Sequence, residues 1–149
     1  MERKRKKTWS EKVDLVKNTF MRSKDRHDFA STFYQNLFFL NPKIKNYFLN
    51  TDFEHQDKAL MRGLEFMLGF LDQTDANARQ QVLRISQSHA QKNMNIYPHD
   101  YYYWIEALVL TMKSTDPMWH KDLEYYIREV ISYPTSFIVS QYFSPGDEV

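Results

Sequence analysis

The sequence contains no cysteine and very little glycine or proline. Its 149 residues include three glycines, five prolines and no cysteine. The lack of cysteine excludes disulfides, thiolate-bound zinc and iron–sulfur clusters within the chain, and it agrees with a reducing cytoplasm. A many-stranded β fold needs a turn residue roughly every 8–12 positions, and this sequence has too few of them. We therefore expect a helical protein.

Long apolar runs and a strong net charge are also missing. No stretch approaches the roughly 20 apolar residues of a membrane span, and the N-terminus lacks the apolar core of a signal peptide. We therefore expect a cytoplasmic protein with no membrane span. The formal net charge of +1 gives no reason to expect a nucleic-acid partner. The basic run from Arg3 to Lys7 is typical of a solvated tail, with a weak contact to acidic lipid or nucleic acid as the alternative.

Apolar residues at helical spacing predict an all-α protein of six or seven helices. Thr8-x-x-Glu11 fits a capping box at the start of the first helix, and Asn41-Pro42 marks a later boundary. Pro134 falls inside the last helix, which it should kink or end early. Residues 1–8 are expected to be a basic flexible extension, 9–143 one domain, and 144–149 a flexible tail. The expected helices span about 9–24, 25–40, 42–48, 52–71 and 76–92, and two more start near 98 and 117.

One histidine lies on the apolar face of a predicted helix. Val82, Ile85, Ser86 and His89 are spaced at i, i+3, i+4 and i+7, which places them on one helix face. An imidazole there can offer one ring nitrogen to a metal while another group holds the second. Zinc would need three or four protein ligands, whereas haem iron needs a single axial ligand. The alternative is a core histidine that bonds a backbone carbonyl.

Three segments stand out by their residues and by their order. They are Thr32-Phe-Tyr-Gln-Asn-Leu-Phe-Phe-Leu-Asn-Pro-Lys-Ile-Lys-Asn-Tyr-Phe48, Gln56-Asp-Lys-Ala-Leu60, and Ser88-His89 followed by Pro98-x-x-Tyr101. Together they resemble the second and third helices, the distal helix and the proximal region of globins. The resemblance is to bacterial single-domain haemoglobins and to the globin part of flavohaemoglobins. It implies a globin fold of six to seven helices around a pocket for haem b.

This resemblance assigns roles to particular residues. His89 would be the iron ligand, and Phe48 would lie flat on the porphyrin. Tyr34 and Gln56 match the distal pair, whose O–H and N–H groups would bond O₂. His55 would take the distal position in a shifted register, although the match at Ala59-Leu60 favours Gln56. The remaining expected haem or ligand contacts are Phe33, Leu37, Leu60, Ile85, Ile96, Tyr101 and Trp104, several of which are equally well explained as core residues.

The sequence departs from flavohaemoglobins at three places near His89. The loop from His89 to Pro98 is about two residues longer, which makes Ile96 the least secure contact. Ser88 stands where those proteins often have a lysine near a haem propionate. The glutamate that completes their proximal Tyr–Glu–His network is missing, because Glu129 is too early. We expect a weaker donation of charge to iron as a result.

The resemblance implies reversible binding of O₂, NO and CO by a haem globin. NO dioxygenation is a further activity that it raises, and this would need an external reductase because no G-x-G-x-x-G turn is present. A gas sensor that signals to a separate partner protein is the alternative. A third hypothesis is a globin-shaped interaction module that has lost haem. The sequence leaves enzymatic activity and oligomeric state open.

Overall fold

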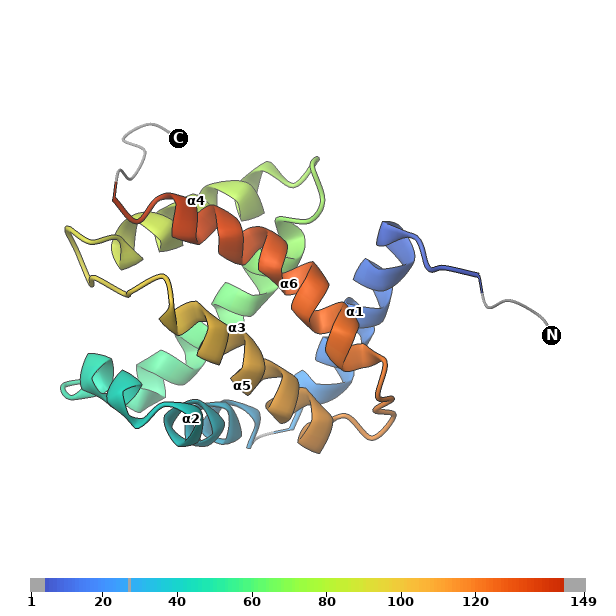
Figure 1. Ribbon diagram of the computed structural model, residues 1–149, viewed down its shortest axis with the longest axis horizontal. Helices are drawn as coiled ribbons and strands as arrows, with labels where there is room; N and C mark the ends of the chain where they lie inside the picture. Colours follow the sequence, from blue (N-terminus) through green and yellow to red (C-terminus); the bar gives the residue numbers. More distant parts are fainter. Residues whose placement is uncertain (1–4, 27, 144–149) are drawn as a thin grey trace.

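The computed structural model describes residues 5–26 and 28–143, which form seven helical segments and no strand (Figure 1). The basic run before Arg5 and the expected tail at 144–149 lie outside these described residues. The prediction of an all-α fold with six or seven helices is confirmed. The segments are α1 (Trp9–Lys24), α2 (Phe29–Leu40), the 3₁₀ helix η1 (Pro42–Phe48), α3 (Phe53–Gly69), α4 (Ala76–His89), α5 (Asp100–Thr115) and α6 (Leu123–Ser140).

Short polar side chains cap several of these helices. Thr8 accepts a hydrogen bond from the backbone N–H of Glu11, and the Glu11 carboxylate accepts one from the N–H of Thr8. The predicted capping box is therefore present. Asn41 accepts from the N–H of Lys43, with a proline at the first position of η1. Such caps satisfy backbone donors that have no partner inside the helix.

Several helix boundaries differ from those expected, and α6 begins at Leu123 rather than near residue 117. α2 begins at Phe29 rather than near residue 25, and the backbone N–H of Phe29 bonds the carbonyl of Arg26. α6 continues through Pro134 to Ser140, so the proline does not end the helix. The side chain of Pro134 is buried, and the Thr135 hydroxyl donates to the carbonyl of Ile131 in the turn before it. Burial in the core outweighs the local preference of proline here.

α6 crosses the molecule and organises the packing (Figure 1). It packs against α1, α4 and α5, while α2 packs on α5 and α3 on α4. These helices enclose one cluster of buried apolar side chains. Burial of such side chains is the main favourable term in folding. The largest fully buried side chains include Phe20, Phe29, Phe33, Leu64, Leu108, Met112, Ile127 and Ile131.

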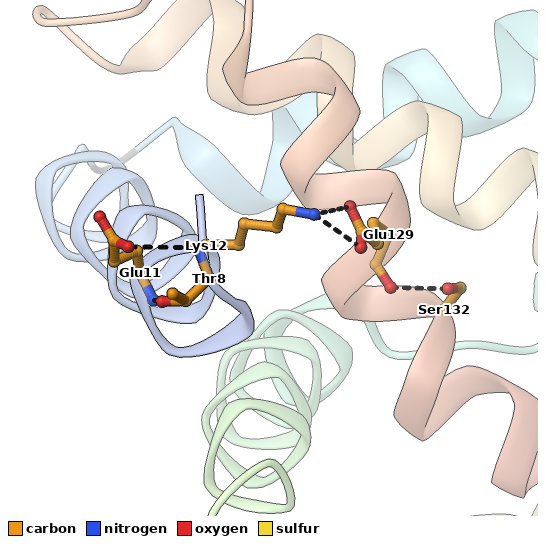
Figure 2. A network of polar contacts seen from close by, with 5 residues as sticks. All are labelled: Thr8, Glu11, Lys12, Glu129 and Ser132. Carbon is orange, nitrogen blue, oxygen red and sulfur yellow. Dashed lines mark hydrogen bonds and ion pairs between the residues drawn. The ribbon is translucent and has the colours of Figure 1, made fainter. Parts of the chain in front are cut away.

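Polar contacts join α1 to α6 at the surface of this core. Figure 2 shows Lys12 reaching from α1 to Glu129 of α6, with its Nζ 3.0 Å from both carboxylate oxygens. Ser132 bonds the backbone carbonyl of Glu129 at 2.7 Å. The Glu129 side chain is half exposed, and exposed pairs of this kind contribute little to stability. Because its carboxylate contacts Lys12 of α1, the Glu129 side chain faces α1.

A buried carboxylate fixes the end of α5 against α1. Asp116 accepts hydrogen bonds from Thr19, from two nitrogens of Arg22, and from the backbone N–H of Met118, at 2.6–2.8 Å. Its side chain has no exposed surface, whereas that of Arg22 is 29% exposed. Burial alone would raise the pKa of Asp116, but the hydrogen bonds from Arg22 and Thr19 outweigh this, and the pKa lies below its ordinary value.

Gly69, at the end of α3, allows a close approach to the start of α4. A Cβ at this position would lie 2.8 Å from the Cβ of Ala78 and 3.0 Å from an Asp75 carboxylate oxygen. We expect Gly69→Ala to lower the free energy of unfolding by about 1–3 kcal/mol, through overpacking. Gly63→Ala is the matched control, because the nearest atom is Ile85 Cδ1 at 3.9 Å. Gly63→Ala should raise the free energy of unfolding by up to about 1 kcal/mol. Urea unfolding measures the change in each variant. Equal changes in the two variants would refute the steric argument.

Candidate functional site

A cavity of about 370 Å³ lies between α2, α3, α4 and α5. This volume falls within the range of small-molecule sites in proteins. Most of its wall is apolar, with a few polar groups among the aliphatic and aromatic side chains. The wall is made by Tyr34, Leu37, Ile44, Tyr47, Phe48, Gln56, Ala59, Leu60, Gly63, Leu64, Met67, Ile85, Ser88, His89, Met94, Ile96, Asp100, Tyr101, Trp104 and Ile138.

His89 lines this cavity as the last residue of α4. We expected α4 to continue to about Lys92, but it ends earlier because the following loop supplies donors to its last carbonyls. The Asn93 side chain donates to the carbonyl of Gln87, and the N–H groups of Met94 and Ile96 donate to those of Ser88 and His89. These bonds satisfy groups that would otherwise have no partner at a helix end. They hold His89 and Ile96 in one wall.

The two ring nitrogens of His89 have different surroundings. Nδ1 lies 2.8 Å from the backbone carbonyl of Ile85, so it carries the hydrogen and donates there, and it lies 2.9 Å from the Ser88 hydroxyl oxygen. Among the described residues Nε2 has no hydrogen-bond partner. Burial lowers the pKa of His89 below its ordinary value, although the bond to Ile85 opposes this. His89 is therefore a neutral imidazole with an available lone pair.

A hydrogen-bonded pair lies in the part of the wall formed by α2 and α3. The Gln56 amide nitrogen donates to the Tyr34 hydroxyl oxygen at 2.9 Å. Burial raises the pKa of Tyr34, so its phenol stays protonated. Because the phenol oxygen accepts from Gln56, its own O–H remains available as a donor in the cavity. His55, the alternative in a shifted register, is exposed and is not in the wall.

Aromatic side chains surround the Tyr34 ring. Phe48 meets it edge to face at 5.5 Å between ring centroids, and Phe53 does so at 5.4 Å. Phe48 lines the cavity, whereas Phe33 does not. Phe33 is fully buried behind the wall, where it contacts Tyr34 and Trp104 at 5.2 and 5.8 Å. The structure thus places Phe33 in a second layer that supports two residues of the wall.

One polar pair in the wall was missed by sequence reasoning. The Tyr47 hydroxyl donates to Asp100 at 2.6 Å and accepts from the N–H of Tyr97 at 3.3 Å. Burial and the bond to Asp100 raise the pKa of Tyr47 to about 12. The two residues are 53 positions apart, so no local pattern joins them. Each adjoins a predicted site residue, Phe48 or Tyr101, and that adjacency was the available signal.

The remaining predicted residues are also placed by the structure. Leu37, Leu60, Ile85, Ile96, Tyr101 and Trp104 all line the cavity. Burial raises the pKa of Tyr101, so its phenol is neutral. The residue that α6 adds to the wall is Ile138. No carboxylate among the described residues bonds the His89 ring.

Neither a metal-binding cluster of side chains nor a membrane-spanning helix is found in the described ranges. No group of three or more histidine, cysteine, aspartate or glutamate side chains there could hold a metal ion. Within residues 5–26 and 28–143, no helix is both long and apolar enough to cross a bilayer.

Comparison with known proteins identifies the fold. The chain is similar to the crystal structure of a Pseudomonas aeruginosa protein described as structurally highly homologous to human haemoglobin. The two chains are 22% identical, and the match covers 89% of this chain and 99% of the other, with a TM-score of 0.81. No protein-family model matches the sequence, and no curated protein matches it significantly. The chain therefore has the globin fold, while the finer resemblance to flavohaemoglobins stays a prediction.

Proposed function

We propose that this chain binds haem b in the cavity through His89 and there binds O₂ reversibly. The observation that carries the proposal is the placement of two kinds of group in one wall. His89 presents a neutral imidazole, and the Tyr34–Gln56 pair supplies a protonated phenol. The globin fold agrees with this assignment. When bound, haem supplies an iron with an open coordination position for O₂, NO or CO.

The residues present fit such a group. A flat macrocycle needs an apolar slot, and the wall contains Phe48, Leu60, Ile85 and Trp104 among its apolar side chains. A haem would need one ligand from the protein, and His89 would hold it through Nε2, the ring nitrogen left without a partner in the described residues. The bond from Nδ1 to a carbonyl fixes the tautomer and the orientation of the ring.

The polar pair would select O₂ among diatomic gases. Tyr34 can donate its O–H into the cavity because Gln56 already satisfies the phenol oxygen. A diatomic ligand with partial negative charge, as O₂ would have in this cavity, would gain from the Tyr34 donor, whereas CO is less polar and would gain less. The pair should therefore slow the release of O₂ more than that of CO.

We expect Tyr34→Phe to raise the dissociation rate of O₂ about 10- to 100-fold and to leave that of CO nearly unchanged. The substitution keeps the ring and removes one charge-assisted donor, of the kind that contributes about 1.5–3 kcal/mol. Stopped-flow displacement on the haem-loaded protein measures both rates. His55→Ala is the control, since that side chain is exposed beside Gln56. An unchanged O₂ rate in Tyr34→Phe would contradict the assigned role.

Reversible binding is favoured over turnover by the surroundings of His89. Its Nδ1 bonds a backbone carbonyl and a serine hydroxyl rather than a carboxylate. A neutral acceptor makes the imidazole a weaker donor of charge to iron, and activation of O₂ benefits from a stronger one. NO dioxygenation would need a source of electrons, and sensing would need an output that responds to the bound gas. Oxygenated protein mixed with NO and a reductant tests the first, through repeated formation of nitrate.

A further inference from the structure

We infer that Asp100 makes this cavity discriminate against carboxylate groups on the ring that it binds. The inference rests on the proposed function and concerns the propionates of haem. Among the described residues in the wall there is no lysine or arginine, and Asp100 is the one acidic residue. A ring that brings two carboxylates into this wall therefore meets a like charge and no opposite one.

The Tyr47 hydroxyl, which could donate to a propionate, is already engaged. It donates to Asp100 at 2.6 Å, a short bond between a phenol and a carboxylate. The backbone N–H of Tyr97 points to the same phenol oxygen. The protein thus supplies its own carboxylate to this donor. A propionate would have to compete with Asp100 for Tyr47 or remain in solvent.

Other neutral donors in the wall cannot replace a cation. The Ser88 hydroxyl already bonds the carbonyl of Ile85 at 2.9 Å, and Tyr101 offers only a neutral phenol. A hydroxyl can donate one hydrogen bond to a carboxylate, but it does not neutralise the carboxylate's charge. Asp100 consequently sets the electrostatic cost of placing propionates beside this wall. The ring that fits best has carboxylates that are masked or that point away from Asp100.

The test compares haem with its dimethyl ester in wild type and Asp100→Asn. Asparagine keeps the shape and an acceptor for Tyr47 while it removes the charge. We expect haem transfer to an excess of apomyoglobin to be about three- to tenfold slower in Asp100→Asn. The substitution removes one negative charge that repels the propionates, and solvent partly screens this repulsion. Loss of the dimethyl ester should be the same in both proteins. Asp14→Asn is the control, because it makes the same change of net charge at an exposed site.

Salt provides a second measurement on the unmodified protein. Raising the ionic strength from about 0.01 M to about 1 M screens exposed charges. Haem loss from wild type should become slower if propionates are repelled. Faster loss at high salt would mean that cations hold them, and this would overturn the inference.

The outcomes separate this inference from the proposed function. Equal rates of haem loss in wild type and Asp100→Asn, with haem bound by both, would overturn only the role of Asp100. A slower rate for the dimethyl ester as well would also overturn it, because the effect would not depend on ring charge. If neither protein binds haem, both proposals fail. Haem binding by Asp100→Asn alone would overturn the proposed function of the wild-type chain, although it would agree with repulsion by Asp100.

Discussion

His89→Ala is expected to weaken the retention of haem by at least about 100-fold. The imidazole is the axial ligand that we assign, and changes even in groups that support a ligand cost about 10- to 100-fold. The variant should also lose the absorption features of a histidine-bound haem. Added imidazole should restore part of them by filling the space that the side chain leaves. Spectral titration and the rate of haem transfer to apomyoglobin measure these effects.

The matched control for His89 is His120→Ala, since the His120 side chain is 67% exposed and lies outside the cavity wall. It should retain haem as wild type does. If His89→Ala binds haem with an unchanged spectrum, another residue holds the iron and the site is wrongly assigned. Circular dichroism of both variants shows whether the helices are intact.

The lowered pKa of His89 should also make the free energy of unfolding of the haem-free protein depend on pH. Burial disfavours the imidazolium, so the folded protein keeps His89 neutral while the unfolded chain protonates below its ordinary value of 6.5. The free energy of unfolding of the haem-free protein should therefore fall as the pH drops from that value to the lowered pKa. His89→Ala should remove this part of the pH dependence. If wild type and His89→Ala show the same pH dependence in urea unfolding, this prediction is contradicted.

Asp116→Ala is expected to lower the free energy of unfolding by about 3–5 kcal/mol. Removal of one partner from a buried ion pair leaves the other charge without compensation. The carboxylate of Asp116 is fully buried and accepts bonds from Arg22, Thr19 and Met118. Its loss would leave the Thr19 hydroxyl and the Met118 N–H without this acceptor. Urea unfolding at neutral pH measures the effect.

Asp122→Ala is the control, because its side chain is 45% exposed and pairs with an exposed histidine; it should cost no more than about 1 kcal/mol. The effect of Asp116→Ala also depends on pH. A carboxylate with a lowered pKa stabilises the protein above its ordinary value, near 3.8, and this contribution is lost as the pH falls through the lowered value. The difference between wild type and variant should therefore shrink at acid pH. A difference that stays constant would refute the ionic contribution.

Much of the fold could be predicted because local chemistry determines it. The Thr8–Glu11 box, the Asn41-Pro42 boundary and the helical spacing of apolar residues act over one or two turns. The end of α4 could not be read in this way. It depends on donors from the loop after Ala90, which reach back to carbonyls of Gln87, Ser88 and His89. The expectation that Pro134 would end α6 early was wrong for a related reason, since its burial in the core overrode its local effect.

The site was less accessible to sequence reasoning than the fold. The order of three segments resembles that of globins, and this resemblance predicted Tyr34, Gln56 and His89 as site residues. The structure brings all three to one cavity. Periodicity alone could not separate a wall residue such as Leu37 from Phe33, which supports the wall from behind. The Tyr47–Asp100 bond joins segments far apart in the chain, and only the packing of η1 beside the start of α5 reveals it.

Titration of the purified protein with haem tests the central claim most directly. We expect saturation at one haem per chain, with an absorption band distinct from that of free haem. After reduction, this band should shift on addition of CO and reversibly on addition of O₂. A titration that yields only the spectrum of free haem would contradict the assignment of this cavity as a haem site.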